Sequence, residues 1–377
     1  MQNKRLINLF TELVKIDSVS SNERDIAKHI ISFLKQVNQH PSNNKPFTIF
    51  TDNSNEKTNS NTGNVICRIG TGGDFLLLSH MDTVESTKLL NPILTEDRIM
   101  TDGKTILGSD NRAGIAAILY ALEKLVIEKT PIKDFTIAFT TCEETTLGGS
   151  TNLELADELK YGFVFDSSYR PGKYIYSSCG AIAFEIEIQG KASHSGISPE
   201  KGINSILIAA KAISDLRIGR LDDETTLNIG LIQGGSAVNV VPEWTKINGE
   251  IRSFNKDKIL IEKDNLLSVF DSRVKEFNGS YKFNYNWDFH PYTHSTEDEI
   301  VGIMEKAMLK SGITPNPTIS FGGSDANSLN GRGIKAVNIG IGAQNPHSAE
   351  EFILIEDLAA SAEIARHLII NEQHVTK

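Results

Sequence analysis

The chain has 377 residues, a formal net charge of -10 at pH 7, an apolar fraction of 39% and a charged fraction of 23%. This length predicts one large core or two domains, and the composition is ordinary for a globular protein. The negative charge argues against nucleic acid or an anionic membrane as the main partner. Three scattered cysteines, without a CxxC pair, exclude a disulfide framework and a zinc finger and favour a reducing compartment.

The N-terminal segment has the pattern of a helix rather than of a targeting signal. Apolar residues recur at helical spacing over residues 6–14 with polar residues between them, whereas a signal peptide needs an unbroken apolar centre. No run of about 18 apolar residues occurs in the sequence, so no transmembrane helix is predicted. We therefore expect no membrane partner and a cytoplasmic location.

The first half of the chain predicts alternating helices and strands. After the helix over residues 6–14, the sequence Ser20-Ser21-Asn22-Glu23 has the form of a capping box that starts a second helix. The polar stretch 40–63 predicts loops around at most one short strand. A helix is expected over residues 115–128, and strands are expected over residues 64–69, 75–82, 132–139 and 161–166. This alternation favours an α/β fold with a largely parallel sheet.

The pattern changes near Ser177. The order of expected elements becomes β-α-β-β-α-β, which is that of a ferredoxin-like unit. These elements are the strands 181–189, 225–233, 245–253 and 281–289 and the helices 202–216 and 256–277. We predict that residues 178–290 form an inserted domain, and that residues 1–177 and 291–377 together form the other domain. The latter ends with a helix, a strand and a helix over residues 297–311, 335–340 and 355–370.

Side chains that bind metals occur at or just after the ends of expected strands. They are His80, Asp110, Glu144, Asp166 and His347. In open α/β sheets, ligands bind outside the carboxyl ends of the strands. Two histidines and three carboxylates suit a pair of zinc-like ions with one carboxylate bridging them.

Each of these residues also has an ordinary structural explanation. His80 could bond to the backbone, Asp110 could cap a helix, and Asp166 could cap a turn. His347 and the pair Glu143-Glu144 could be solvated loop residues. Taken singly, each of these explanations is favoured over metal binding. Their joint occurrence at the strand ends of one sheet favours the metal site.

The motifs His80-Met81-Asp82, Gly108-Ser109-Asp110-Asn111, Glu143-Glu144, Asp166 and His347, in this order, resemble those of the M20 metallopeptidases. The closest resemblance is to their peptidase T-like group of aminotripeptidases, and it spans nearly the whole chain. It implies a zinc-exopeptidase-like catalytic domain of the α/β class, with a mostly parallel mixed sheet. It also implies that the inserted α+β ferredoxin-like domain is a lid.

The resemblance assigns a role to each candidate metal ligand. His80 and Asp166 would bind one Zn²⁺, Glu144 and His347 would bind the other, and Asp110 would bridge both, with Co²⁺ or Mn²⁺ as substitutes. The peptide bond between Asp110 and Asn111 would be cis.

Further roles follow from matching positions. Asp82 would hold the far ring nitrogen of His80, and Glu143 would be the general base. In the inserted domain, His194 would stabilise the oxyanion, while Asn239 and Arg252 would bind the substrate. The backbone amides of Gly322 and Gly323 would line the same pocket. One departure is Arg112, since many family members have lysine there. Another is the variable sequence after Glu144, which leaves the substrate subclass open.

The expected function is metal-dependent hydrolysis of an amide bond in a short peptide. Closure of the lid would bring His194 and Arg252 to the metals and exclude water. One alternative is an N-acyl amino acid amidohydrolase of the same family. Another is a metal-binding or regulatory protein without turnover, against which the intact set of ligands and Glu143 argues. Both a homodimer through the lid domain and a monomer remain compatible with the sequence.

Overall fold

The computed structural model describes residues 3–372, which form two compact units. The first unit runs to Tyr176 and resumes over His294–Ile319 and from Ser324 onward. The second unit comprises Ser177–Thr293 and the short segment Ser320–Gly323. The second unit overlaps the predicted inserted domain of residues 178–290 and also contains the segment Ser320–Gly323. Within residues 3–372, no helix combines the length and the apolar character needed to cross a bilayer.

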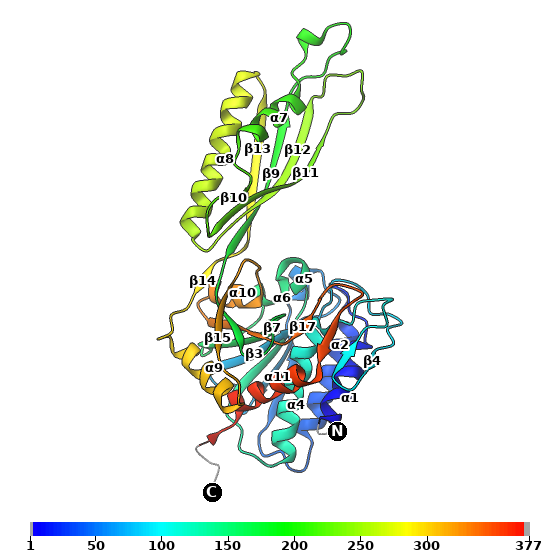
Figure 1. The fold of residues 1–377 in the computed structure, drawn as a ribbon, viewed down its shortest axis with the longest axis vertical. Coiled ribbons are helices and arrows are strands. Elements are labelled where there is room, and N and C mark those ends of the chain that lie inside the picture. The colour runs from blue at the N-terminus through cyan, green and yellow to red at the C-terminus, as the bar shows by residue number, and fades with distance from the viewer. Residues whose placement is uncertain (1–2, 373–377) are drawn as a thin grey trace. The chain divides into compact units, whose positions relative to one another are not determined.

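The first unit is built around a mixed sheet whose central strands are parallel (Figure 1). Its strand order is β1-β2-β6-β3-β7-β16-β8-β14, where β14 is the two-residue strand Tyr292–Thr293, and β15 also pairs with β8. The four strands from β6 to β16 pair in parallel, whereas β1, β2 and β8 pair antiparallel with their neighbours. The strand bounds are Phe47–Thr51 (β1), Val65–Ile69 (β2), Phe75–His80 (β3), Phe135–Thr140 (β6), Tyr161–Ser167 (β7), Lys173–Ser178 (β8), Asn316–Ser320 (β15) and Lys335–Gly340 (β16).

Every residue of β3 and of β6 is buried, as expected of central strands covered on both faces. Helix α4, which is buried along most of its length, packs against the strands β3 and β7 and against the helices α1 and α11. The helices of this unit are Lys4–Val14 (α1), Arg24–Asn38 (α2), Asn55–Thr58 (α3), Ser109–Ile127 (α4), Glu143–Thr146 (α5), Gly148–Thr151 (α6), Glu299–Lys310 (α9), Asp325–Gly331 (α10) and Ile355–Ile369 (α11). A small antiparallel sheet contains Ile93–Leu94 (β4), Arg98–Met100 (β5), Ala343–Gln344 (β17) and Phe352–Leu354 (β18).

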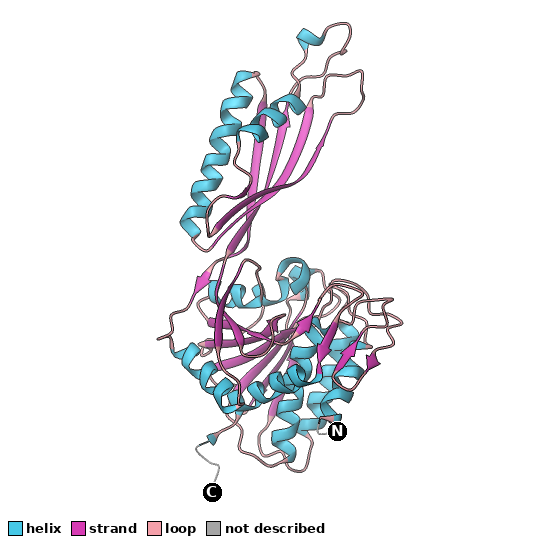
Figure 2. Cartoon of the chain, in the orientation of Figure 1, coloured by secondary structure: helices cyan, strands magenta, loops and turns pink. Residues whose placement is uncertain are grey.

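The second unit is an antiparallel sheet with two helices (Figure 2). Its strand order is β10-β11-β12-β9-β13, and the helices α7 and α8 pack on this sheet. A separate apolar core, which includes Ile186, Ile247 and Phe270, lies between helices and sheet. The bounds are Gly180–Gln189 (β9), Ser205–Asp215 (α7), Gly219–Arg220 (β10), Thr225–Gly234 (β11), Trp244–Ser253 (β12), Lys256–Glu276 (α8), Ser280–Phe289 (β13) and Tyr292–Thr293 (β14).

The predicted α/β class and the ferredoxin-like order of the inserted elements are confirmed. The predicted second helix is present as α2, but the predicted capping box is wrong, because the helix begins at Arg24 and its first N–H donates to the Asn61 side chain instead. The Ser20 hydroxyl instead donates to Asp82. The Glu23 carboxylate is buried and accepts hydrogen bonds from the Ser60 hydroxyl and the Cys142 backbone N–H. The side chains of Ser20 and Glu23, which would have formed the capping box, therefore bond to residues elsewhere in the fold.

Candidate metal centre

The five candidate ligands converge at one edge of the central sheet. His80 is the last residue of β3, Asp166 is near the end of β7, and Glu144 follows β6 in the short helix α5. These three strands are parallel, so their carboxyl ends meet at the same edge. Asp110 comes from the start of α4, and His347 from the loop after β17.

The ligands form two groups of three that share Asp110. In the first group, Nε2 of His80 lies 3.1 Å from Oδ1 of Asp110 and 3.1 Å from Oδ1 of Asp166. In the second group, Nε2 of His347 lies 3.2 Å from Oε1 of Glu144 and 3.5 Å from Oδ2 of Asp110. The donor atoms within each group are all within 4.8 Å of one another. Asp110 thus offers one oxygen to each group, as a bridging carboxylate would.

The charges of the site fit a cation. Hydrogen bonds to Asp110 and Glu144 raise the pKa of His347 to about 10. Burial lowers the pKa of His80, but hydrogen bonds to Asp110, Asp166 and Asp82 outweigh it and raise that pKa well above its usual value. Both shifts report a strongly negative potential where the two imidazoles meet the carboxylates. Imidazole nitrogens and carboxylate oxygens in this number are a donor set for two zinc-like ions.

Asp82 supports the site from behind. Its carboxylate Oδ1 lies 3.4 Å from Nδ1 of His80, although the backbone oxygen of Asp82 is nearer to that nitrogen, at 3.1 Å. The same carboxylate accepts the backbone N–H groups of Glu143 and Glu144, at 3.0 and 3.1 Å. Asp82 therefore links the orientation of His80 to the turn that carries both glutamates.

Glu143 has the surroundings of a group that exchanges a proton. Burial raises the pKa of its carboxyl well above the usual value, and the negative charges of Asp166, Asp325 and Glu144 add to this effect. A carboxylate with a raised pKa is a better proton acceptor near neutral pH than an ordinary one. No hydrogen bond from another described residue reaches its side chain, in contrast to Glu144.

The segment that carries Asp110 is held by a residue that the sequence analysis missed. The carboxylate of Glu351 is buried and accepts the backbone N–H groups of Leu107, Gly108 and Asp110, at 2.8, 2.9 and 3.2 Å. It also accepts the hydroxyl of Ser109 at 2.6 Å. Nothing in the sequence distinguishes Glu351 from the exposed Glu350, because the contact joins segments 241 to 244 positions apart.

Two amide side chains that the sequence analysis also missed position Asp166. Asn111 donates to its Oδ1 at 3.0 Å and to the backbone oxygen of Phe165 at 2.7 Å. Asn338, on the neighbouring strand β16, lies 3.4 Å from Oδ2 of Asp166. The predicted cis peptide bond between Asp110 and Asn111 is confirmed.

Arg112, the departure noted from the sequence, is fully buried beneath the site. Its guanidinium donates to the backbone oxygens of Met81 and Leu13, at 2.7 and 3.4 Å, and to the hydroxyl of Ser18. The arginine therefore ties α1 and the strand end at His80 to the start of α4. It takes no part in the groups of metal donors.

The remaining candidates all belong to the second unit. His194 and Asn239 are exposed loop residues, and Nδ1 of His194 accepts the backbone N–H of Gly196 at 3.2 Å. The Arg252 guanidinium donates to the Phe321 backbone oxygen and to Glu250, both at 2.8 Å. The N–H of Gly322 donates to the Ser320 hydroxyl at 3.0 Å. The fifth of these candidates, Gly323, has the Phe289 ring close to its Cα.

Comparison with known proteins gives the context of these observations. The peptidase dimerisation domain of the M20 peptidases matches residues 176–280. The uncharacterized protein YqjE of Bacillus subtilis is 33% identical over 375 residues, which cover 98% of each chain. The crystal structure of aminopeptidase PepT from Bacillus cereus is 33% identical and has a TM-score of 0.88, covering 97% of this chain and 98% of that one. A tripeptidase structure from Staphylococcus aureus is 29% identical, with a TM-score of 0.89 and 97% coverage of both chains.

Proposed function

Since the chain belongs to the M20 peptidases, in their peptidase T-like group, we propose that it hydrolyses an amide bond in short peptides with the help of two zinc ions. The observation that carries the proposal is the pair of donor groups that share Asp110, with Glu143 next to them. A hydrolase of this kind needs two adjacent metal positions and a proton acceptor. The acyl group of the substrate must lie within reach of the metals and of the proton acceptor.

The proposed ligands are His80 and Asp166 for one ion and Glu144 and His347 for the other, with Asp110 bridging. When bound, the ions supply a positive charge that polarises the substrate carbonyl and lowers the pKa of the attacking water. Co²⁺ or Mn²⁺ would suit the same donors, since both accept imidazole and carboxylate ligands.

The proposed general base is Glu143, whose carboxylate takes a proton from the attacking water and delivers it to the leaving amine nitrogen. Asp82 positions both His80 and the backbone of Glu143. In the second unit, His194 is proposed to stabilise the oxyanion. Arg252 and Asn239 are proposed to bind the substrate, and the planar guanidinium of Arg252 suits a carboxylate.

A digest of a defined peptide mixture, analysed by mass with and without a chelator, tests this function. We expect release of residues from di- and tripeptides, loss of this activity with the chelator, and recovery when Zn²⁺ is added back. Cleavage that the chelator leaves unchanged would contradict the proposal. The same experiment on N-acetyl amino acids tests the deacylase alternative, which the peptidase names of the similar structures do not favour.

We also propose a homodimer through the second unit, on the basis of its match to a dimerisation domain. Strand β11 supports this proposal. No strand within residues 3–372 pairs with its outer edge beyond the two-residue pairing with β10, and this end exposes Leu231 and Ile232. An apolar strand edge of this kind is a template for pairing with another chain.

A further inference from the structure

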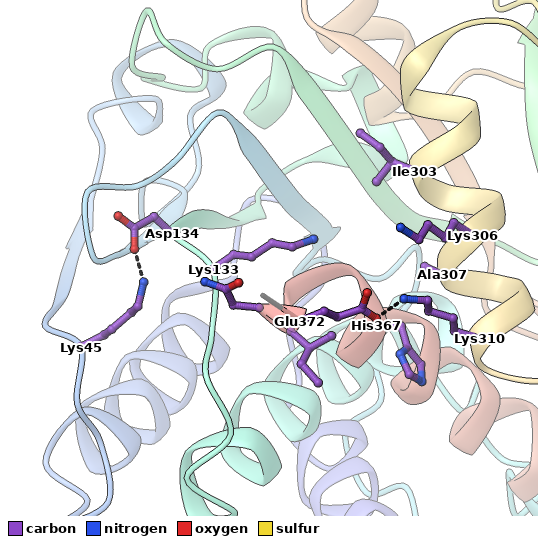
Figure 3. Close-up of a pocket in the computed structure, with 11 residues that line it drawn as sticks. Lys45, Lys133, Asp134, Ile303, Lys306, Ala307, Lys310, His367 and Glu372 are labelled. Carbon is purple, nitrogen blue, oxygen red and sulfur yellow. Dashed lines mark hydrogen bonds and ion pairs between the residues drawn. The ribbon is translucent and has the colours of Figure 1, made fainter. Parts of the chain in front are cut away.

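A second candidate site lies in the first unit, at the other end of β6 from the metal donors. It is a cavity of about 640 Å³ (Figure 3). Lys133 and Asp134, which line it, immediately precede β6, whereas Glu143 and Glu144 follow that strand. A six-residue strand spans roughly 20 Å, so the cavity is separate from the metal centre. Its lining residues are Lys45, Lys133, Asp134, Ile303, Lys306, Ala307, Lys310, His367, Ile370, Asn371 and Glu372.

The positive and negative side chains that line this cavity are unequal in number. Among its lining residues are four lysines but only two carboxylates. Lys45 forms an ion pair with Asp134, and Lys310 forms an ion pair with Glu372. Among the described residues, the ammonium groups of Lys133 and Lys306 are therefore left without an ion-pair partner.

The two remaining lysines face the same space. The half-buried Lys133 donates to the backbone oxygen of Leu368 at 2.7 Å, and its ammonium lies 5.6 Å from the centre of the Phe75 ring. Figure 3 shows Lys133 and Lys306 pointing toward one another across the cavity. Within residues 3–372, the Lys306 side chain has neither a hydrogen bond nor an ion pair.

Charges of both signs act on Lys133, although the lysines that line the cavity outnumber its carboxylates. Burial lowers the pKa of Lys133; Glu372 opposes this, and the charges of Lys306 and Lys310 lower the pKa further. An anion between the two ammonium groups gains Coulomb energy from both, and the half-buried Lys133 contributes more than the exposed Lys306, because it is less screened by water. A further polar atom, Nδ1 of His367, is buried without a hydrogen-bond partner among the described residues.

We propose that this cavity binds a small phosphate monoester, with the phosphate dianion between Lys133 and Lys306. Lysine ammonium groups bind phosphate as point charges, and two of them match a dianion. Ile303, Ala307 and Ile370 form an apolar wall against which the organic part of the ester would lie. The volume is within the range of small-molecule sites and exceeds what inorganic phosphate alone would fill.

Calorimetric titration of the metal-loaded, full-length protein with phenyl phosphate tests the proposal. Inorganic phosphate and benzoate serve as comparison ligands at matched ionic strength. We expect phenyl phosphate to bind more tightly than either, because only it has both the dianion and the apolar part. Inorganic phosphate binding equally well would identify free phosphate as the ligand and overturn the ester.

Charge reversal identifies the place of binding. We expect Lys306→Glu to weaken phenyl phosphate binding at least tenfold. Lys275→Glu, the same change at an exposed lysine on α8 of the second unit, should leave binding unchanged. Equal binding by both variants would overturn the proposal, since a phosphate held at the metal centre would give that result. Lys306→Glu should hydrolyse peptides like the wild type, so failure of this site and failure of the proposed peptidase function are distinguishable.

Discussion

Glu143 and Glu144 are adjacent in the chain, yet their side chains have different surroundings. Glu144 contacts His347 at 3.2 Å, whereas the Glu143 carboxylate is influenced mainly by burial and by neighbouring negative charges. Both backbone N–H groups donate to Asp82, which fixes the turn between them. Identical side chains can therefore have separate tasks, one as a metal ligand and the other as a proton acceptor.

A conservative change at the proposed base tests this division. Glu143→Gln keeps the volume of the side chain but removes the proton acceptor, so we expect peptide hydrolysis to fall about 100- to 10,000-fold. Metal content, measured by elemental analysis, should stay near that of the wild type. The control is His80→Ala, which should lower metal content because it removes a ligand. Turnover retained in Glu143→Gln would exclude Glu143 as the base.

At the scale of elements, the site depends on contacts that fix the start of α4. Glu351 receives four hydrogen bonds from the segment that ends at Asp110, and hydrogen bonds to a charged acceptor are the stronger kind. Its carboxylate contacts Asp110 through the backbone N–H, so its effect on the site is through the position of Asp110.

Glu351→Gln should therefore disturb both stability and metal binding. The glutamine amide keeps one acceptor oxygen but turns an NH₂ group toward N–H donors, so we expect a loss of about 2–3 kcal/mol in the free energy of unfolding. Metal affinity should fall about 10- to 100-fold, as is typical when a partner of a ligand is removed. Denaturant unfolding and metal competition measure the two effects. Glu350→Gln, at the exposed neighbour, is the matched control and should change neither.

Arg112 connects three elements through one side chain. Replacing it with methionine would leave the buried Ser18 hydroxyl without its donor, at a cost of about 1–3 kcal/mol, whereas the Met81 backbone oxygen would keep its hydrogen bond from that hydroxyl. We expect Arg112→Lys, with a single ammonium in place of the fork, to lose less stability than Arg112→Met. Thermal unfolding of the two variants gives the comparison. Equal losses of stability in the two variants would contradict this expectation, because the remaining ammonium group of lysine would then contribute nothing.

The sequence predicted those parts of the structure that depend on local pattern. The buried strands that end at His80 and near Asp166 have long apolar runs, so their position and their terminal ligands could be predicted. The short elements β8, β15 and α10 were missed, because their sequences have little periodicity and tertiary pairing stabilises them. Glu351, Asn111 and Asn338 were missed because their roles depend on which distant segments meet. The capping box at Ser20 was predicted wrongly for the same reason, because Ser20 and Glu23 bond to residues from distant segments.

At the scale of the whole molecule, the second unit has the surface expected of an oligomer contact. Leu231 and Ile232 are 61% and 52% exposed on the unpaired end of β11. We expect Ile232→Arg to shift the protein from dimer to monomer in sedimentation velocity, because a buried charge without a partner opposes association. Lys282→Arg, on β13 at the opposite edge of the sheet, keeps the charge and should not change the oligomeric state. A dimer that persists in Ile232→Arg would place the contact elsewhere.

The order of the proposed metal ligands along the chain has a consequence for biosynthesis. The first ligand is at residue 80 and the last at residue 347, and each donor group contains residues from segments that are far apart. Domains generally begin to fold while the ribosome is still adding residues. His80, Asp110 and Asp166 are made early, but Asn338 and Glu351, which position Asp166 and Asp110, are made near the end of this sequence, as is His347. Neither donor group would therefore be held in place until the last segments of this sequence have been made, so both metals would bind late in synthesis.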